Sequence, residues 1–129
     1  MQITPGSTAT IVRTVAEQDT AAAVGSGDLP VLATPVLLAW LEAATVAVCG
    51  ATETETTVGS RVGIDHVRPS RVGARIECTA TVAEVDGPMV TFKVQAMQRM
   101  DDGEALVGRG VVTRAVVDRE RLLQRAAEG

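Results

Sequence analysis

His66 is the only histidine of the chain, and so the only side chain whose ordinary pKa lies close to neutral pH. The segment TVGSRVGIDHVRP alternates with a period of two, which predicts a strand. Asp65 falls on the opposite face from His66 and is not its partner. The histidine is either a general acid–base or a core residue satisfied by a backbone group. The face that carries it is predicted to hold Val58, Ser60, Val62, Ile64 and His66.

Glu42 lies in the middle of an apolar run, PVLLAWLEAATVAVC, that covers residues 35–49. Ionising a lone carboxylate among apolar side chains costs several kcal/mol. Either the helix turns Glu42 toward solvent, or the carboxylate is paired with a cation or held in a ligand pocket. Because nearly all of its neighbours are apolar, we favour a functional carboxylate.

Thr34 and Pro35 are typical of a helix start, with the threonine as the N-cap and the proline in the first helical position. That structural role is sufficient to explain the pair. Alternatively, the hydroxyl, beside the free N–H groups of a helix N-terminus, faces a bound carbonyl or oxyanion. Glu42 follows about 12 Å along the helix axis and about 80° around it, so the two side chains are expected to flank a substrate without touching.

One long helix and five strands are predicted to position these residues. The helix covers residues 35–49, ends at Gly50 and is expected to be buried on nearly every side. A flap made of a short helix or turn and a loop is expected over residues 17–30, and a charged helix or frayed end after residue 117. The predicted strands are residues 7–15, 57–69, 74–85, 89–100 and 105–117.

The turn signals DGP and DDGE predict that the last three strands form two antiparallel hairpins. Gly108 and Gly110 indicate a bulge or a close approach of another backbone or a ligand. This order of elements predicts an α+β fold in which the sheet curls around its only long helix. Since such a sheet leaves one face and an edge exposed, we also expect a homodimer with the active cleft near the subunit interface.

The composition describes one globular domain over residues 1–129, with a net charge of -4 and 2% aromatic residues. The acidic balance and the scarcity of aromatic rings argue against a nucleic-acid partner. No segment is typical of a membrane span or a secretion signal, so we expect a cytoplasmic protein without a membrane partner. Cys49 and Cys78 lack the spacing of a metal site, so we expect no metal and two reduced, buried thiols.

In combination these motifs resemble the hot dog fold thioesterases, and within them the fluoroacetyl-CoA thioesterase group. The resemblance covers nearly the whole chain. In that group a threonine opens the central helix, a glutamate follows eight positions later, and a glycine precedes an essential histidine by seven. Thr34 with Glu42 and Gly59 with His66 keep both spacings, while LATPVLLAWLEAA, IDHVRPSRVG and GRGVVTRAVV resemble the family's helix start, histidine strand and final strand.

The resemblance implies a hot dog fold and an acyl-CoA thioesterase acting on a small or medium acyl thioester of CoA or of a carrier protein, with no further cofactor. It implies that Thr34, Glu42 and His66 are catalytic. It also implies that Gly59 allows close approach to the thioester and that Arg114 orients a carboxylate or the substrate. The residues leave open whether Glu42 attacks the thioester or His66 activates water.

The flap departs from the fluoroacetyl-specific pattern, because that form has phenylalanines over the acyl site and AVGSGDLPVLAT has none. We therefore expect an acyl group other than fluoroacetyl, different or longer. Val31 and Leu32, together with Val24 and Leu29, are expected to bind it.

Two other functions remain open, because a fold does not determine a function. A hot dog hydratase or dehydratase would also use a histidine and an acidic residue on an acyl thioester. A non-catalytic protein that binds an acyl thioester or another small ligand would need the pocket alone.

Overall fold

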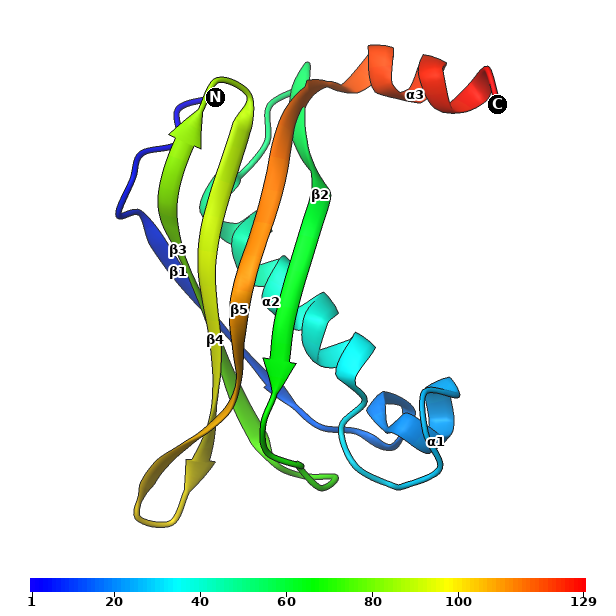
Figure 1. Ribbon diagram of the computed structural model, residues 1–129, viewed down its shortest axis with the longest axis vertical. Coiled ribbons are helices and arrows are strands. Elements are labelled where there is room, and N and C mark those ends of the chain that lie inside the picture. Colours follow the sequence, from blue (N-terminus) through cyan, green and yellow to red (C-terminus); the bar gives the residue numbers. More distant parts are fainter.

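The computed structural model describes all residues, 1–129, as an antiparallel five-stranded sheet curved around a long helix (Figure 1). The helices are α1 (Ala21–Val24), α2 (Thr34–Cys49) and α3 (Arg119–Ala127), and a 3₁₀ turn covers Glu17–Asp19. The strands are β1 (Thr8–Thr14), β2 (Glu55–His66), β3 (Arg75–Asp86), β4 (Met89–Met100) and β5 (Gly103–Asp118). Their order in the sheet is β1-β3-β4-β5-β2, which makes β1 and β2 the two edges. The predicted α+β architecture is confirmed.

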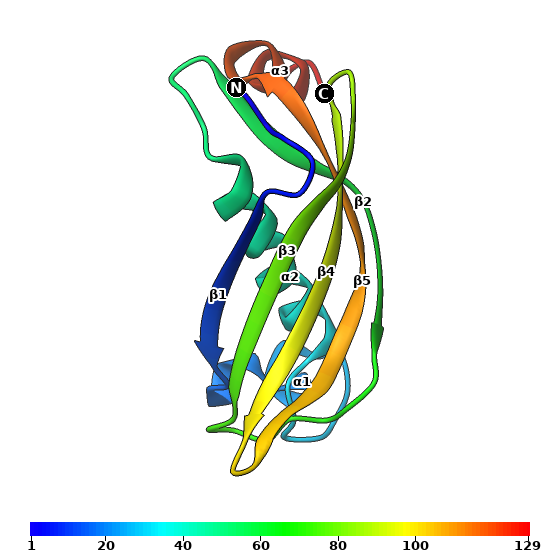
Figure 2. The ribbon, with the colours of Figure 1, turned by 90° about the vertical axis from the view of Figure 1, so that its left-hand side faces the viewer.

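Two tight turns connect β3, β4 and β5 into a meander, as the DGP and DDGE signals predict. Gly87 and Gly103 in these turns have φ values of +59° and +103°, a region that glycine adopts without steric cost. β1 and β2 pair with the outer strands of this meander. Figures 1 and 2 show α2 lying along one face of the resulting sheet.

The core lies between α2 and this face of the sheet. Leu37 and Leu41 of α2 and Phe92 of β4 are each 0% exposed, and most of the other buried side chains are valine and alanine. The opposite side of α2 is open, since Ala39 and Ala47 are exposed and Val46 is 47% exposed. The expectation that α2 is buried on nearly every side is therefore wrong for the single chain, because its one sheet covers only one side of the helix.

β2 contains a β-bulge at Ser60, which has no partner in β5. Before the bulge, Thr57 and Gly59 face α2, and after it Val62 pairs with the buried Val112, so the inward face continues through Val62 to His66. The predicted face is confirmed for Val62, Ile64 and His66. It is wrong for Val58 and Ser60, because the extra residue exchanges the two faces of the strand.

Gly108 and Gly110 of β5 lie opposite His66 and Ile64. A Cβ on Gly108 would lie 2.9 Å from Leu37 Cδ2, and one on Gly110 would overlap the carbonyl oxygen of Gly63. The close backbone approach indicated by these glycines is confirmed, and it brings the His66 end of β2 against β5 and α2.

The tail forms helix α3 instead of a frayed end. The Asp118 side chain accepts a hydrogen bond from the Arg121 N–H at 2.9 Å and caps it. α3 leaves β5 at the end of the sheet far from α1 and projects past β2 (Figure 1). Neither α3 nor the other helices are long and apolar enough to cross a membrane.

Candidate active site

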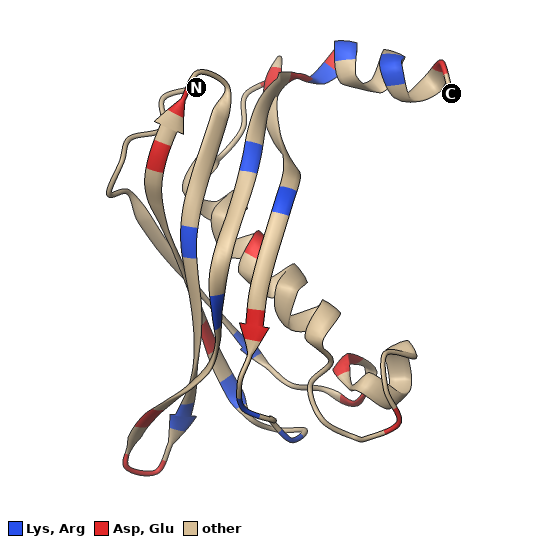
Figure 3. Cartoon of the chain, in the orientation of Figure 1, with Lys and Arg blue, Asp and Glu red and all other residues tan.

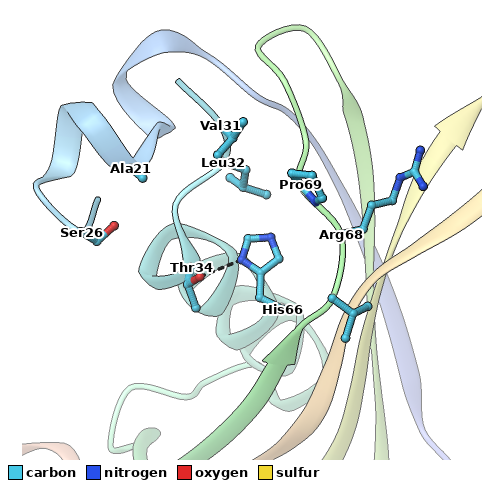
Figure 4. Close-up of a pocket in the computed structure, with 9 residues that line it drawn as sticks. Ala21, Ser26, Val31, Leu32, Thr34, His66, Arg68 and Pro69 are labelled. Atoms are coloured by element: carbon cyan, nitrogen blue, oxygen red, sulfur yellow. Dashed lines mark hydrogen bonds between the residues drawn. The ribbon is translucent and has the colours of Figure 1, made fainter. Parts of the chain in front are cut away.

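Thr34 and His66 form a hydrogen bond, with 2.8 Å between Thr34 Oγ1 and His66 Nδ1 (Figure 4). The threonine is the first residue of α2, whose N-cap is Ala33 and lacks a side-chain capping bond. The predicted N-cap role of Thr34 is therefore wrong. Because the helix begins one residue earlier than expected, the hydroxyl points to the imidazole instead of back to the helix.

His66 also presents a free ring nitrogen, since Nε2 is buried and has no hydrogen-bond partner. Figure 4 shows this edge of the ring turned toward the flap residues Val31 and Leu32. Burial lowers the pKa of His66 below its usual 6.5, an effect that the backbone of Arg68 opposes. The imidazole is therefore neutral at pH 7, and one of its nitrogens is available to accept a proton.

A cavity of about 310 Å³ lies beside this pair, between the flap, the start of α2 and the end of β2. Val31 and Leu32 line it, as expected, together with Ser26. Val24 and Leu29 do not line it and are 46% and 61% exposed, so their contact with an acyl group stays a prediction.

The first turn of α2 supplies hydrogen-bond donors close to the pair. The first bond along the helix runs from the Leu37 N–H to the Ala33 carbonyl. The N–H groups of Thr34 and Val36 therefore have no acceptor within the helix, and Pro35 has no N–H. Donors of this kind stabilise a developing oxyanion.

Glu42 belongs to a second group of residues, further along α2. Its side chain is 34% exposed, and Oε2 lies 3.9 Å from Arg114 Nη1. A Cβ on Gly59 would lie 2.8 Å from the same carboxylate oxygen. The absence of a side chain at Gly59 thus leaves room for the Glu42 carboxylate, which is compensated by a cation as the apolar run requires.

Arg114 is nearly buried, at 7% exposed, and its position is fixed by Thr57. The guanidinium donates from Nε to Thr57 Oγ1 at 2.9 Å and from Nη2 to the Thr57 carbonyl at 3.0 Å. Thr57 was not among the predicted site residues, and its only signal in the sequence is its place two residues before Gly59. Cys49 lies nearby, but burial raises its pKa, so it is a thiol at neutral pH and not an activated nucleophile.

The predicted site residues therefore form two separate groups within one chain. Thr34, His66, Val31 and Leu32 meet at the cavity. The second group lies further along α2 and contains Glu42 of α2, Gly59 of β2 and Arg114 of β5. The eight residues between Thr34 and Glu42 correspond to about 12 Å of helix, so one chain does not bring the whole set into contact.

The family model of FlK, the fluoroacetyl-CoA-specific thioesterase, matches residues 15–120. The chain belongs to this thioesterase family. A comparison with curated protein sequences found no match.

Several solved structures share the fold of this chain over nearly its whole length. FlK itself is 20% identical, with a TM-score of 0.86 and coverage of 99% of this chain and 98% of that chain. A hot-dog-like protein from Thermanaerovibrio acidaminovorans is 23% identical, with a TM-score of 0.84 and coverage of 98% and 92%. A thioesterase superfamily member from Thermus thermophilus is 25% identical, with a TM-score of 0.85 and coverage of 98% and 95%. The hot dog fold is thus confirmed.

We predict that the pKa of His66 in the folded thioesterase lies below 6.5, because burial disfavours the imidazolium. The ring protons of this single histidine can be followed by NMR across pH, with the urea-unfolded chain as the control. Since the unfolded state binds the proton more readily, His66 also lowers the stability of the fold as pH falls below about 6.5. A folded-state pKa above that of the unfolded chain would contradict the prediction.

We predict that Gly59→Ala displaces the Glu42 carboxylate without unfolding the chain, because the atom in conflict ends a flexible side chain. Acyl-CoA hydrolysis should fall about ten- to a hundredfold with an unchanged melting temperature. The parent protein is the reference, and a thermal melt of the variant is the folding control. Equal rates for the variant and the parent would show that the space at Gly59 is not needed.

Proposed function

We propose that this protein is an acyl-CoA thioesterase that hydrolyses a small or medium acyl thioester to the acid and free CoA. The observation that carries the proposal is the bond between Thr34 and the neutral His66 at a cavity, in a chain of a thioesterase family. Similar solved structures include FlK with acetyl-CoA and an acyl-CoA hydrolase from Staphylococcus aureus with coenzyme A.

In the proposed reaction His66 acts as the general base. It accepts a proton from water while the water oxygen bonds to the thioester carbon, and the oxyanion forms near the free N–H groups at the start of α2. The carbon–sulfur bond then breaks, and the CoA thiolate takes the proton from the imidazolium. Thr34 holds the imidazole in place, and Glu42 orients the water or stabilises the imidazolium. Water and these residues complete the reaction, so the proposal includes no cofactor.

We further propose that the working unit is a homodimer in which the β2 strands of two chains pair. β2 is an edge strand, with Val62 43% exposed near its middle, and the apolar side of α2 is open. An unpaired edge next to an uncovered apolar surface is what a second copy would bury.

Pairing of two β2 strands would also unite the two groups of site residues. With a two-fold axis at Val62, antiparallel pairing sets His66 opposite Val58 of the partner subunit, and with an axis at Gly63 it sets His66 opposite Ser60 of the partner subunit. Gly59 of the partner subunit lies between these two positions, Val58 and Ser60, and is next to Glu42 of the same subunit. We therefore propose that Thr34 and His66 of one chain act with Glu42 and Arg114 of the other.

The acyl group is proposed to differ from fluoroacetyl, because the flap residues that reach the cavity are small or aliphatic. We also propose a cytoplasmic location. The free thiols of Cys49 and Cys78 support it, since a reducing compartment keeps thiols unpaired.

We predict an order of effects among three substitutions, measured as hydrolysis of the best substrate in a panel of acyl-CoAs with thiol detection. His66→Ala should lower kcat by about 10²- to 10⁴-fold, since it removes the only proton carrier active at neutral pH. Glu42→Gln should cost nearly as much, because an amide cannot replace the carboxylate. Thr34→Ala should cost less, because the imidazole and the helix N–H donors remain.

Thermal melts of the three variants provide the folding control. Thr34 makes no capping bond, so its loss should leave the melting temperature nearly unchanged. Parental activity in all three correctly folded variants would refute the site and favour a binding protein. Hydration of an enoyl thioester without release of thiol would favour the hydratase.

We predict that mixing inactive His66→Ala and Glu42→Gln chains restores activity if each site uses both chains. After unfolding and refolding together in equal amounts, half of the dimers are mixed and each has one intact site, so activity should reach about a quarter of the parent. Each variant refolded alone is the control. Light scattering should show twice the 13.4 kDa chain mass. A monomer, or a dimer without restored activity, would contradict the shared site.

A further inference from the structure

The segment between β2 and β3 carries an unusual charge for this chain. Residues 67–75, here called the arginine turn, read VRPSRVGAR and contain three arginines and no acidic residue. The chain as a whole has a net charge of -4. Figure 3 shows these basic positions at the end of the sheet that carries α1, while the arginines of α3 lie at the opposite end.

The side chains of Arg68, Arg71 and Arg75 make no ion pair or hydrogen bond within the chain. The two ion pairs of the structure involve Glu55 and Glu42, and neither includes an arginine of the turn. Arg71 and Arg75 are exposed, and Nε of the half-buried Arg68 has no hydrogen-bond partner although it is shielded from water. No acidic side chain of this chain therefore neutralises the three guanidinium groups.

The backbone of the arginine turn is held firmly. Ser70 is 1% exposed, donates from Oγ to Gln98 Oε1 at 2.7 Å and accepts the Leu32 N–H at 2.8 Å. At the far side of the turn, the Gly73 N–H donates to the Val15 carbonyl at 2.8 Å. Because these hydrogen bonds already order the backbone, little conformational entropy would be lost there when a ligand binds.

The turn also borders the cavity. Val67, Arg68 and Pro69 form part of the cavity wall, and Val31 of the flap forms a β-bridge with Arg71. Figure 4 shows the Arg68 side chain directed outward, away from His66. The arginines are therefore placed for an anion that remains outside the cavity while another part of the same molecule reaches His66.

We propose that Arg68, Arg71 and Arg75 bind the phosphate groups of CoA, an inference that rests on the proposed thioesterase function. CoA carries several phosphate charges, separated from the thioester by the pantetheine arm, and guanidinium groups match phosphate with paired hydrogen bonds. An acidic protein repels such a substrate at long range, so a local basic surface is needed to attract it. The arginine turn provides that surface at the mouth of the cavity.

The test is calorimetric binding of free CoA, of dephospho-CoA, which lacks one phosphate, and of pantetheine, which lacks all the phosphates and the adenosine. CoA should bind more tightly than pantetheine. The double variant Arg68→Gln/Arg71→Gln should weaken CoA about tenfold and leave pantetheine unchanged, and adding Arg75→Gln should weaken CoA further. Arg121→Gln/Arg125→Gln on α3 is the matched control, with the same change in net charge and unchanged CoA affinity.

Higher salt should weaken CoA binding more in the parent than in the double variant. Equal CoA affinity in the double variant and the control, equal affinity for CoA and pantetheine, or no binding of CoA would each overturn the proposal. An enzyme that turns over only acyl-carrier protein and does not bind free CoA would overturn it as well.

Hydrolysis separates this proposal from the thioesterase proposal. Arginine-dependent CoA binding without any hydrolysis of acyl-CoA would leave the phosphate surface intact and refute the enzyme. Hydrolysis of acyl-CoA with the same KM in the double variant and in the control would support the enzyme and refute the phosphate surface.

Discussion

The pairing of β2 with β5 determines where the candidate site residues lie. Gly59 and His66 are seven positions apart, an odd number, so a regular strand would direct them to opposite faces. The unpaired Ser60 between them restores both to the face of α2. One extra backbone residue thus allows the space at Gly59 and the imidazole of His66 to serve the same side of the sheet.

Much of this arrangement could be predicted from the residues. The apolar run around Glu42 marked α2, the turn residues marked the two hairpins, and period-two alternation placed His66 on the inner face. Three features could not be predicted in this way. The bulge at Ser60 depends on how β2 aligns with a distant strand, and the bond from Thr34 to His66 depends on where the helix begins within one residue. The open side of α2 depends on how far one sheet can curve.

The buried arginine illustrates how the fold accommodates charge beside an apolar helix. Arg114 is nearly enclosed, and Thr57 satisfies two of its nitrogens with a hydroxyl and a carbonyl. The remaining charge faces Glu42, so each ion reduces the cost of shielding the other from water. An otherwise apolar helix can carry the Glu42 carboxylate because the cation that faces it, Arg114, comes from a different element, β5.

The flap contains no aromatic side chain and is held by hydrogen bonds of its backbone. Its shape is carried by the main chain: the Ala21 N–H donates to the Val31 carbonyl, the Ala22 N–H to the Leu29 carbonyl, and the Ala33 N–H to the Asp19 carbonyl. Backbone bonds of this kind are indifferent to the side chains attached to them. Ser26 and Val31 contribute side chains to the cavity wall, while backbone bonds hold the loop, so a substitution at either position changes the cavity wall without removing these bonds.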